Sequence, residues 1–338
     1  MNSRARLRAI IAGEPADRCG FWFGNPHPDT WPIYHRYFGT ATEEELRRKL
    51  GDDFRWICPQ FFPDCYPAAG GRGIFDGGIG KKRSHGQAGP FAECEDPREV
   101  EDFPWPKAEI CVFDTCIAAL HKAGDFYRAS GLWTCFYHNI MDLFGMESYM
   151  VKMYTHPEVV HAVTDRVCQF YYDANDRFFR EAGDEADGFF FGNDFGTQLD
   201  LICGPEQFDA FILPWFRRFT ELGHRHGKQV ILHSCGAIHR VIERLIDVRV
   251  NCLHPLQALA RNMDAATLAR DFGSRIAFMG GIDTQQLLVH ATPGEVAAEV
   301  RRVKRLLGPR LIVSPSHEAL LPNVPPENVA AMAAAAAE

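Results

Sequence analysis

His233 and Cys235 are the residues of this chain whose types and spacing most directly suggest chemistry. They stand in the run Gln229-Val-Ile-Leu-His-Ser-Cys-Gly236, where a short apolar stretch ends in a histidine, a cysteine and a glycine. Imidazole nitrogen and thiolate sulfur are donors that zinc prefers, and a catalytic zinc site commonly has three protein ligands and one open position. The pair therefore predicts the first two ligands of a zinc site.

The same pair also fits an ordinary structural role, because a His-x-Cys spacing alone is a weak zinc signal. In that interpretation His233 hydrogen-bonds a neighbouring carbonyl group and Cys235 is an unreactive thiol. The position of the pair favours the metal site, since a helical pattern begins at Ala237 and the amino end of a helix lowers the pKa of a nearby thiol. Both interpretations stay open from these residues alone.

Polar residues stand at the ends of most of the predicted strands, which lie near residues 19, 54, 132, 188, 229, 250, 276 and 311. Parallel strands of a barrel share one rim at their carboxyl ends, so residues far apart in sequence can meet over one pocket. Six strands end in groups able to do chemistry: His138, Asn193 with Asp194, His233 with Cys235, His254 with Gln257, Asp283, and Ser316 with His317. Of these, His317 is the best placed third zinc ligand, whereas His138 and His254 are expected to be structural hydrogen-bonding residues.

The elements that position these residues alternate between strand and helix along the chain. Apolar residues at helical spacing predict helices at residues 4–12, 42–50, 114–124, 141–154, 157–182, 204–227, 237–246 and 292–307, and from residue 325 onward. The third strand is predicted at residues 132–138. Composition does not change between the two halves. The alternation therefore predicts a single (β/α)₈ barrel domain over residues 1–338, with an amino-terminal extension, rather than a doubly wound sheet.

A glycine-rich stretch interrupts this pattern at residues 69–90. It predicts a loop or a hairpin excursion. Its basic cluster, Lys81, Lys82, Arg83 and His85, is either a contact for an acidic ligand or a solvated loop. A phosphate-binding loop is not predicted, because Gly80-Lys81 is followed by a second lysine rather than by serine or threonine.

Composition argues against several classes of function. The net charge of −8 is spread over interleaved acidic and basic residues, which argues against nucleic acid as the main partner. No apolar run approaches the roughly 18 to 20 residues of a membrane span, and the amino end leads into a polar helix rather than a signal core. The 11 cysteines include no Cys-x-x-Cys pair, and several stand in apolar runs, as free core thiols do. A soluble, cytoplasmic protein in a reducing compartment is expected.

Five segments of the chain together resemble the uroporphyrinogen decarboxylase superfamily. They are Asp194-Phe-Gly-Thr-Gln198, His233-Ser-Cys-Gly236, Asn251-Cys-Leu-His-Pro-Leu-Gln257, Gly280-Gly-Ile-Asp-Thr284, and Ser314-Pro-Ser-His317 followed by Pro326-Glu-Asn328. Within the superfamily the chain is most similar to the zinc-dependent, corrinoid-linked branch, the methylcobalamin:coenzyme M methyltransferase-like proteins. The similarity spans essentially the whole chain and includes Asp17-Arg18 after the first predicted helix.

The resemblance implies a (β/α)₈ barrel and a zinc site. In the methyltransferase branch the ligands are the histidine and cysteine of a His-x-Cys-Gly motif and a cysteine shortly before a Pro-x-Glu-Asn motif. His233 and Cys235 match the first two ligands, but His317 stands at the third position in place of cysteine. Histidine can ligate zinc, although it gives a less electron-rich site than cysteine.

The resemblance also implies methyl transfer between a corrinoid protein and a small molecule, either a thiol or a methoxy compound. The 26 Phe, 6 Trp and 9 Tyr favour a flat or apolar substrate. The Asp-x-His-x-x-Gly signature of corrinoid binding is missing from the sequence, so a separate corrinoid protein would dock over the rim. Four residues are expected to orient the substrate or the metal ligands, unless they form only a hydrogen-bonded rim: Asp194, Gln198, Gln257 and Asp283. The oligomeric state stays open, with a homodimer as one candidate.

A metal-free decarboxylase or lyase is the main alternative. In such an enzyme Asp194 or Asp53 would stabilise a protonated intermediate, and His317 would act as a general acid. Porphyrinogen itself is disfavoured as the substrate. Decarboxylases of this superfamily carry an arginine-rich segment after the first strand, and residues 21–33 contain no arginine. A third alternative is a binding protein that keeps the barrel without turnover.

Overall fold

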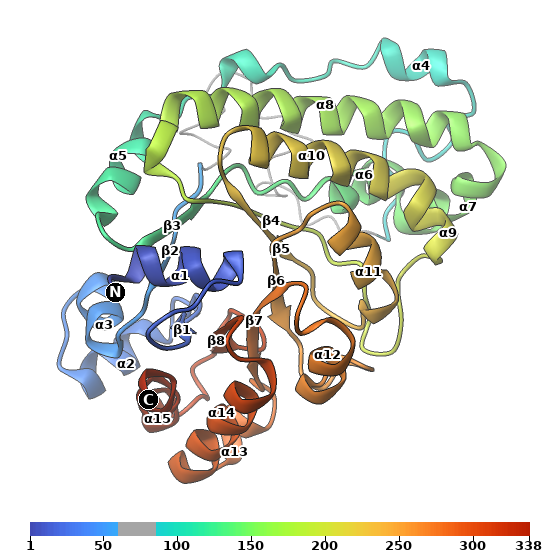
Figure 1. Ribbon diagram of the computed structural model, residues 1–338. Coiled ribbons are helices and arrows are strands. Elements are labelled where there is room, and N and C mark those ends of the chain that lie inside the picture. The colour runs from blue at the N-terminus through green and yellow to red at the C-terminus, as the bar shows by residue number, and fades with distance from the viewer. Residues whose placement is uncertain (60–85) are drawn as a thin grey trace.

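An eight-stranded parallel sheet forms the centre of the protein in a computed structural model, which describes residues 1–59 and 86–338 (Figure 1). The strands are β1 Gly20–Phe21, β2 Phe54–Trp56, β3 Tyr127–Ser130, β4 Gly188–Gly192, β5 Gln229–His233, β6 Cys252–Leu256, β7 Ala277–Ile282 and β8 Leu311–Pro315. They follow the order β1-β8-β7-β6-β5-β4-β3-β2, so the sheet curls until its first and last strands in sequence are neighbours. The predicted (β/α)₈ barrel is confirmed.

Asp53 joins the two free edges of this sheet, β1 and β2. Its N–H donates to Phe21 O at 2.9 Å, and its carboxylate accepts from the Phe21 N–H at 3.1 Å. The carboxylate also accepts hydrogen bonds from Arg6 and Arg18. Because Asp53 precedes β2, this network lies at the amino-terminal end of the strands, where helix α1 (Ser3–Ala12) packs against the sheet.

Helices cover the outer side of the sheet, as Figure 1 shows. After α1 they are α2 Trp31–Phe38, α3 Glu43–Leu50, α4 Pro97–Glu101, α5 Asp114–Ala123, α6 Phe136–Phe144, α7 Met146–Thr155, α8 Pro157–Ala182, α9 Pro205–Gln207, α10 Leu213–Arg225, α11 His239–Asp247, α12 Ala265–Phe272, α13 Leu287–His290, α14 Pro293–Leu307 and α15 Pro326–Ala337. Short 3₁₀ turns lie at Ala108–Ile110 and Gly183–Glu185, and a π-helical turn at Phe208–Ile212. The helix predicted at residues 157–182 is confirmed at both ends. The start predicted at Thr42 is also confirmed, because Thr42 and Glu45 form a capping box.

The third strand lies earlier in the chain than the sequence predicts. It covers Tyr127–Ser130, whereas residues 132–135 form a loop and residues 136–138 are already the first residues of α6. Gly131 follows the strand with a φ of +101°, a conformation that favours glycine. The charged residue Arg128 made residues 127–130 look unlike a strand, whereas the aromatic run after Gly131 has the composition that is typical of one. His138 therefore lies within α6 and not at a strand end.

Two predicted helices are each interrupted. The helix predicted at residues 141–154 is divided at Gly145, whose φ of +85° ends α6 before α7 begins. The helix predicted at residues 204–227 begins as the short α9 and the π-helical turn, and becomes the regular α10 only at Leu213. The loop or hairpin predicted at residues 69–90 falls mostly outside the described residues.

The interior of the barrel is filled by inward-facing side chains, which form a floor under the carboxyl end of the strands. One apolar cluster combines strand residues with α1, and its members are Leu7, Ile10, Ile11, Trp22, Phe54, Tyr127, Ala129, Phe190, Ile231, Cys252, Ala277, Met279 and Ile312. Side chains alternate along a strand. The next inward position after Ile231 on β5 is therefore His233, and the next after Cys252 on β6 is His254. Both histidines lie directly above the apolar floor.

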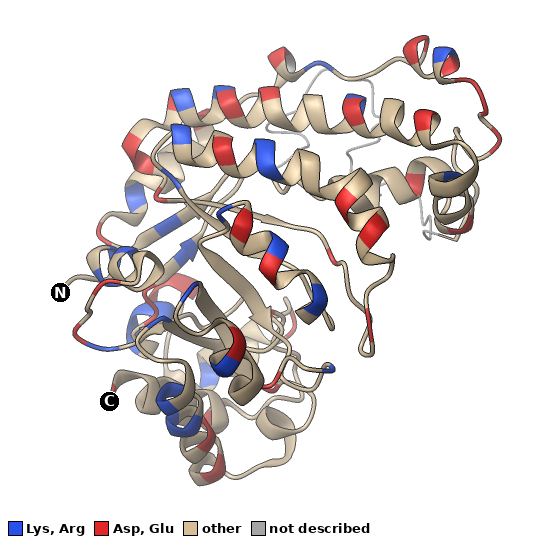
Figure 2. Ribbon diagram, turned by 45° about the vertical axis from the view of Figure 1, so that its right-hand side comes forward, with Lys and Arg blue, Asp and Glu red and all other residues tan. Residues whose placement is uncertain are grey.

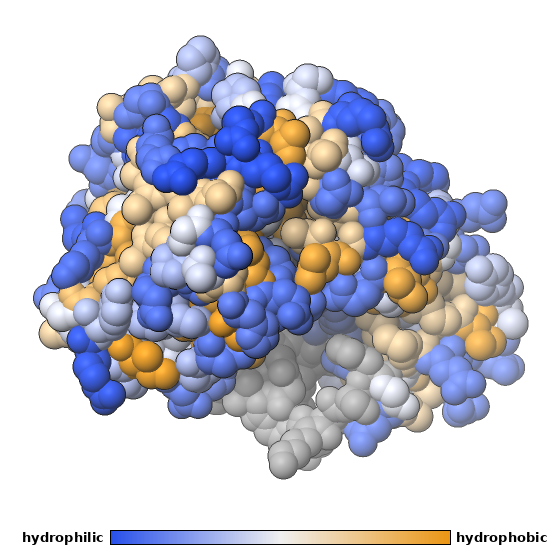
Figure 3. Space-filling model, turned by 90° about the horizontal axis from the view of Figure 1, so that it is seen from below, coloured by the Kyte–Doolittle hydropathy of each residue, from blue (hydrophilic) through white to orange (hydrophobic). Residues whose placement is uncertain are grey.

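Charged residues of both signs are interleaved along the outer helices, as Figure 2 shows for the long helices of the upper layer. On the face drawn in Figure 3, apolar residues occur in small groups between polar ones. Within residues 1–59 and 86–338, no helix combines the length and the apolar character that a bilayer crossing requires.

Candidate metal centre at the barrel mouth

The turn after β5 carries the candidate ligands and is held by the turn after β4. Gly236 has a φ of +88°, and a Cβ atom there would lie 2.3 Å from the carbonyl oxygen of Gly196. The Ala237 N–H donates to Thr197 O at 2.7 Å. Only glycine fits a position that is both left-handed and this crowded. The glycine of the His-x-Cys-Gly run thus lets the two turns pack backbone against backbone.

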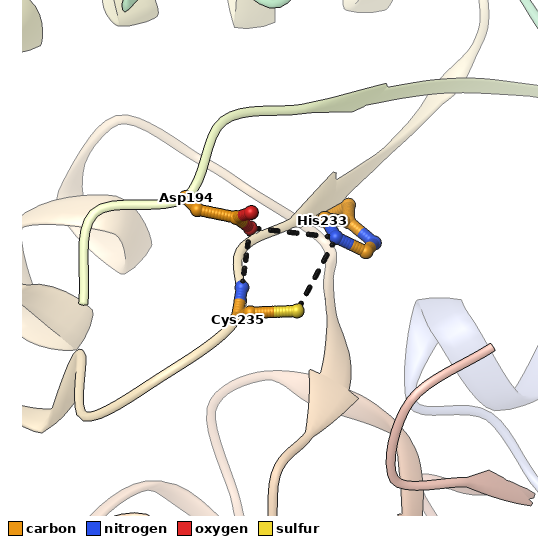
Figure 4. A group of neighbouring side chains, drawn as sticks. All are labelled: Asp194, His233 and Cys235. Carbon is orange, nitrogen blue, oxygen red and sulfur yellow. Dashed lines mark hydrogen bonds and ion pairs between the residues drawn. The ribbon is translucent and has the colours of Figure 1, made fainter. Parts of the chain in front are cut away.

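Asp194, His233 and Cys235 bring three candidate metal donors together at this end of the barrel (Figure 4). Cys235 Sγ and Asp194 Oδ1 each lie 3.5 Å from His233 Nε2. The Asp194 carboxylate also accepts a hydrogen bond of 2.8 Å from the Cys235 N–H. One donor atom from each residue lies within 4.8 Å of the other two. Nitrogen, sulfur and carboxylate oxygen are all zinc ligands, so the donor set fits the predicted ion.

The pKa of the Cys235 thiol is raised, contrary to the prediction that a helix end lowers it. Burial raises this pKa, and the negative charges of Asp194 and Glu318 raise it further. Helix α11 begins only at His239, so its amino end is too far along the chain to favour a thiolate. A divalent cation would offset the same negative charges. The electrostatics of the site are therefore a second reason why its residues fit a metal ion.

His233 lies between two carboxylates. Its Nε2 faces Asp194, and its Nδ1 lies 3.8 Å from Glu318 Oε2. Burial lowers the pKa of His233, but the hydrogen bond to Asp194 and the charge of Glu318 outweigh burial and raise the pKa overall. Burial likewise raises the pKa of Asp194, yet the hydrogen bond and charge of His233 bring that pKa below its usual value. The two groups therefore favour each other's charged forms.

His254 and Glu318 form a second group around His233. His254 Nδ1 lies 3.1 Å from His233 Nδ1, and the three residues can also offer donor atoms within 4.8 Å of one another. His254 Nε2 and Glu318 Oε2 are buried and have no hydrogen-bond partner among the described residues. Burial lowers the pKa of His254 well below its ordinary value, and the charges of His233 and His317 lower it further, so His254 is neutral.

The predicted third ligand, His317, lies outside both groups of donors. Its side chain is 45% exposed, and its Nδ1 lies 3.7 Å from Glu318 Oε2. The same nitrogen accepts a hydrogen bond of 3.3 Å from the Ala319 N–H. In this conformation Asp194, and not His317, stands beside His233 and Cys235. The role of His317 as a zinc ligand stays a prediction.

The remaining predicted site residues serve the loops around the mouth in different ways. Gln257 Oε1 accepts a hydrogen bond of 2.7 Å from the Gly236 N–H and so holds the ligand-bearing turn. The Asp283 carboxylate accepts from three N–H groups at the start of α13. The Gln198 side chain is exposed, and the backbone carbonyl of this residue accepts a hydrogen bond from the Arg261 N–H. Contacts of Gln198, Gln257 and Asp283 with a substrate stay predictions.

Aromatic rings line the barrel interior beside His233. Trp133 lies edge-on to His233 with ring centroids 5.3 Å apart, and Trp56 lies 5.1 Å from Trp133. A Cβ atom at Gly192 would lie 2.2 Å from the Trp133 ring, so this glycine leaves the space that the ring occupies. The Trp56 indole N–H is buried and has no hydrogen-bond partner in the described part of the chain. The metal donors therefore adjoin a wall of indole rings.

Three residues of the site were not predicted from the sequence or were assigned a different role: Glu318, Trp133 and His138. Glu318 was missed, although alternation counted from the inward Ser314 places residue 318 rather than 317 toward the interior. Trp133 was assigned to a strand, and only the loop before α6 brings it over the mouth. His138 still acts on the site from α6, because its charge contributes to lowering the pKa of Asp194.

Comparison with known proteins agrees with this architecture. A methyltransferase from Methanosarcina mazei has a similar structure, with a TM-score of 0.70 and 18% sequence identity over 100% of this chain and 98% of that chain. At this identity the likeness shows a shared fold. No curated protein matches the chain. The sequence profile of the family described as uroporphyrinogen decarboxylase (URO-D) matches residues 112–338, which is more than half of the chain. The chain belongs to the uroporphyrinogen decarboxylase family.

Proposed function

We propose that this protein is a zinc-dependent methyltransferase that moves a methyl group between a corrinoid protein and a thiol or methoxy small molecule. The observation that carries the proposal is the meeting of Asp194, His233 and Cys235 at the carboxyl end of a barrel of this family. A zinc ion held there would act as a Lewis acid toward the sulfur of a thiol or the oxygen of a methyl ether.

Each residue of the cluster has a distinct part in this proposal. His233 provides a nitrogen donor, and Cys235 provides sulfur once its thiol proton is lost. Asp194 holds the turn through the Cys235 N–H and offers an oxygen donor. The indole rings of Trp56 and Trp133 exclude water beside these donors and suit a flat or apolar group on the substrate.

A separate corrinoid protein would donate or accept the methyl group across the open end of the barrel. Three exposed leucines lie on the loops that follow β4, β6 and β8, and they are Leu199, Leu259 and Leu321. Apolar side chains exposed around a site are typical of a surface that contacts another molecule. The position of these leucines supports docking over the rim.

Methyl transfer itself is the test of this function. Zinc-loaded protein is incubated with methylcobalamin and a panel of thiols, or with reduced cobalamin and a panel of methoxyarenes. The proposal predicts transfer that stops with a zinc chelator and in His233→Ala and Cys235→Ser, and that continues in His226→Ala. The control residue, His226, pairs with Asp176 on the outer helices. Turnover that survives loss of zinc would contradict the proposal.

A metal-free decarboxylase is the second candidate, because the matching family is described as uroporphyrinogen decarboxylase. In this second candidate Asp194 is the carboxylate that we favour. The other carboxylate considered for it, Asp53, has no exposed surface and is paired with Arg6 and Arg18 at the opposite end of the strands. Release of carbon dioxide from a non-porphyrin carboxylate by zinc-free protein would favour this second candidate.

A further inference from the structure

Two imidazole rings face each other inside the barrel. His233 on β5 and His254 on β6 are direct partners in the strand register, and their Nδ1 atoms lie 3.1 Å apart. Two nitrogens at this distance share one hydrogen, so one ring donates and the other accepts. The direction of that hydrogen bond determines which nitrogen of His233 keeps a free lone pair.

Packing holds both rings in place. His254 is 1% exposed and lies against Trp22 and Phe190, with ring centroids 4.9 Å and 5.4 Å away. Trp133 packs edge-on against His233. A charged imidazole in the surroundings of His254 would be costly, so His254 is a neutral ring with one N–H. The pair therefore has only two arrangements of its hydrogens when His233 is neutral.

The positions of the donor atoms of Cys235 and Asp194 favour one of these two arrangements. Both atoms lie 3.5 Å from Nε2 of His233, on the side away from His254. A nitrogen that ligates a metal carries no hydrogen. If Nε2 is the ligand, the hydrogen of His233 lies on Nδ1 and donates to His254. The reverse arrangement would place the hydrogen on Nε2 and block it.

We propose that His254 is a positioning residue that accepts the Nδ1 hydrogen of His233 and thereby presents Nε2 of His233 to the metal. This inference rests on the proposed zinc site. In this arrangement the hydrogen of His254 lies on Nε2, which is buried and has no hydrogen-bond partner among the described residues. A buried histidine with a purely structural role is expected to satisfy its polar atoms. His254 instead directs one nitrogen at His233, and within residues 1–59 and 86–338 the other has no partner.

Zinc affinity of substituted proteins tests this role without any activity measurement. In His254→Asn the amide oxygen stands near the position of Nδ1 and keeps an acceptor. In His254→Leu the acceptor is lost, while leucine suits the apolar contacts with Trp22 and Phe190. His226→Leu is the control, because it removes a histidine hydrogen bond of 2.8 Å to Asp176 on the outer helices. Thermal unfolding verifies that each variant is folded.

The expected result is a loss of zinc affinity of about 10- to 100-fold in His254→Leu, with near wild-type affinity in His254→Asn and His226→Leu. The thiolate-to-metal absorption of the cobalt(II) form should persist in every variant, because the ligands themselves are unchanged. Equal affinity in wild type and His254→Leu would overturn the proposal. Loss of metal from both His254 variants, with an altered cobalt spectrum, would also overturn it by making His254 a ligand.

The failure of this inference is distinct from the failure of the proposed function. Wild-type protein that binds zinc, responds to the His254 substitutions as expected and transfers no methyl group would refute the reaction and uphold the role of His254. Active, zinc-loaded His254→Leu protein with unchanged zinc affinity would refute the role of His254 and uphold the reaction.

Discussion

At the scale of single residues, the protonation of Cys235 decides how the site can bind a metal. Asp194 and Glu318 act with burial to keep the pKa of this thiol above its ordinary value. The thiol is therefore protonated at neutral pH in the absence of a cation. Metal binding must release that proton, so the affinity for zinc depends on pH.

We expect the apparent zinc affinity to rise by at least about tenfold for each pH unit across the neutral range. The sign follows from the raised pKa of Cys235: below that pKa each lower pH unit makes the thiolate about ten times rarer. The pKa of His233 is also raised, so its proton steepens the dependence further toward acid. Competition with a coloured chelator at several pH values measures this dependence. A flat profile would show that Cys235 is not a ligand.

Asp194 and His317 compete for the third ligand position, and their substitutions separate the two assignments. Asp194→Asn keeps the acceptor for the Cys235 N–H but removes the negative charge, so we expect zinc affinity to fall at least about tenfold. His317→Ala should leave the affinity unchanged, because the histidine is half-exposed and outside the donor groups. The opposite pattern would identify His317 as the ligand. Chelator competition again provides the measurement.

The sequence predicts some site residues and not others, for a geometric reason. His233 and Cys235 share one turn, so their spacing alone indicates a pair of donors. The approach of Asp194 depends on how the turns after β4 and β5 pack together, and that packing is not visible in either segment alone. Glu318 differs from His317 by a single position, and alternation favours Glu318 only if the chain stays extended beyond the end of β8 at Pro315.

At the scale of the elements, the close packing of two turns is what holds the donors in place. Gly236→Ala forces a side chain into the left-handed region and against the Gly196 carbonyl, 2.3 Å away. We expect it to lower the free energy of unfolding by at least about 2 kcal/mol and to abolish tight zinc binding. Denaturant unfolding and a zinc titration measure the two effects.

Gly227→Ala is the matched control for that substitution. Gly227 also has a left-handed backbone, with a φ of +69°, but within the described part of the chain a Cβ atom there would have no neighbour within 4 Å beyond the adjoining residues. It should cost only about 1 kcal/mol and leave zinc binding intact. Equal effects of the two substitutions would mean that backbone strain, and not the contact between the turns, determines the site.

Elements were predictable where local residue patterns agreed with their environment. The run at β5 is continuously apolar because both faces of the strand are buried. At β3 the residue pattern placed the strand at the wrong position. Arg128 lies buried in this strand because it forms ion pairs with Asp187 and Glu185, which come from elsewhere in the chain. A charged residue neutralised by distant partners cannot be recognised as part of a strand from its own segment.

At the scale of the whole molecule, the network that stabilises the fold and the candidate metal donors lie at opposite ends of the barrel. At the contact between β1 and β2, Asp53 accepts hydrogen bonds from Arg6 of α1 and from Arg18. The metal donors lie at the other end of the strands. The alternation of strands and helices made this architecture predictable. The contact between β1 and β2 was not predictable, because it is made by the backbone and side chain of the single residue Asp53 and not by a regular ladder.

Asp53→Asn should destabilise the protein by about 3 kcal/mol, because it leaves the partly buried Arg6 and Arg18 without their shared carboxylate. Zinc affinity of the folded protein should not change. Asp17→Asn is the control: this carboxylate also pairs with Arg6 but is 41% exposed, so its loss should cost no more than about 1 kcal/mol. Thermal unfolding compares the two. Loss of activity in Asp53→Asn without loss of stability would instead support a catalytic Asp53.

The metal content of the protein, purified without added metal, tests the central claim most directly. Elemental analysis by mass spectrometry should find close to one zinc ion per chain in the wild type and in His226→Ala. It should find little zinc in His233→Ala and in Cys235→Ser, although both variants remain folded. A folded wild-type protein that holds no zinc and takes up none when zinc is supplied would contradict the claim.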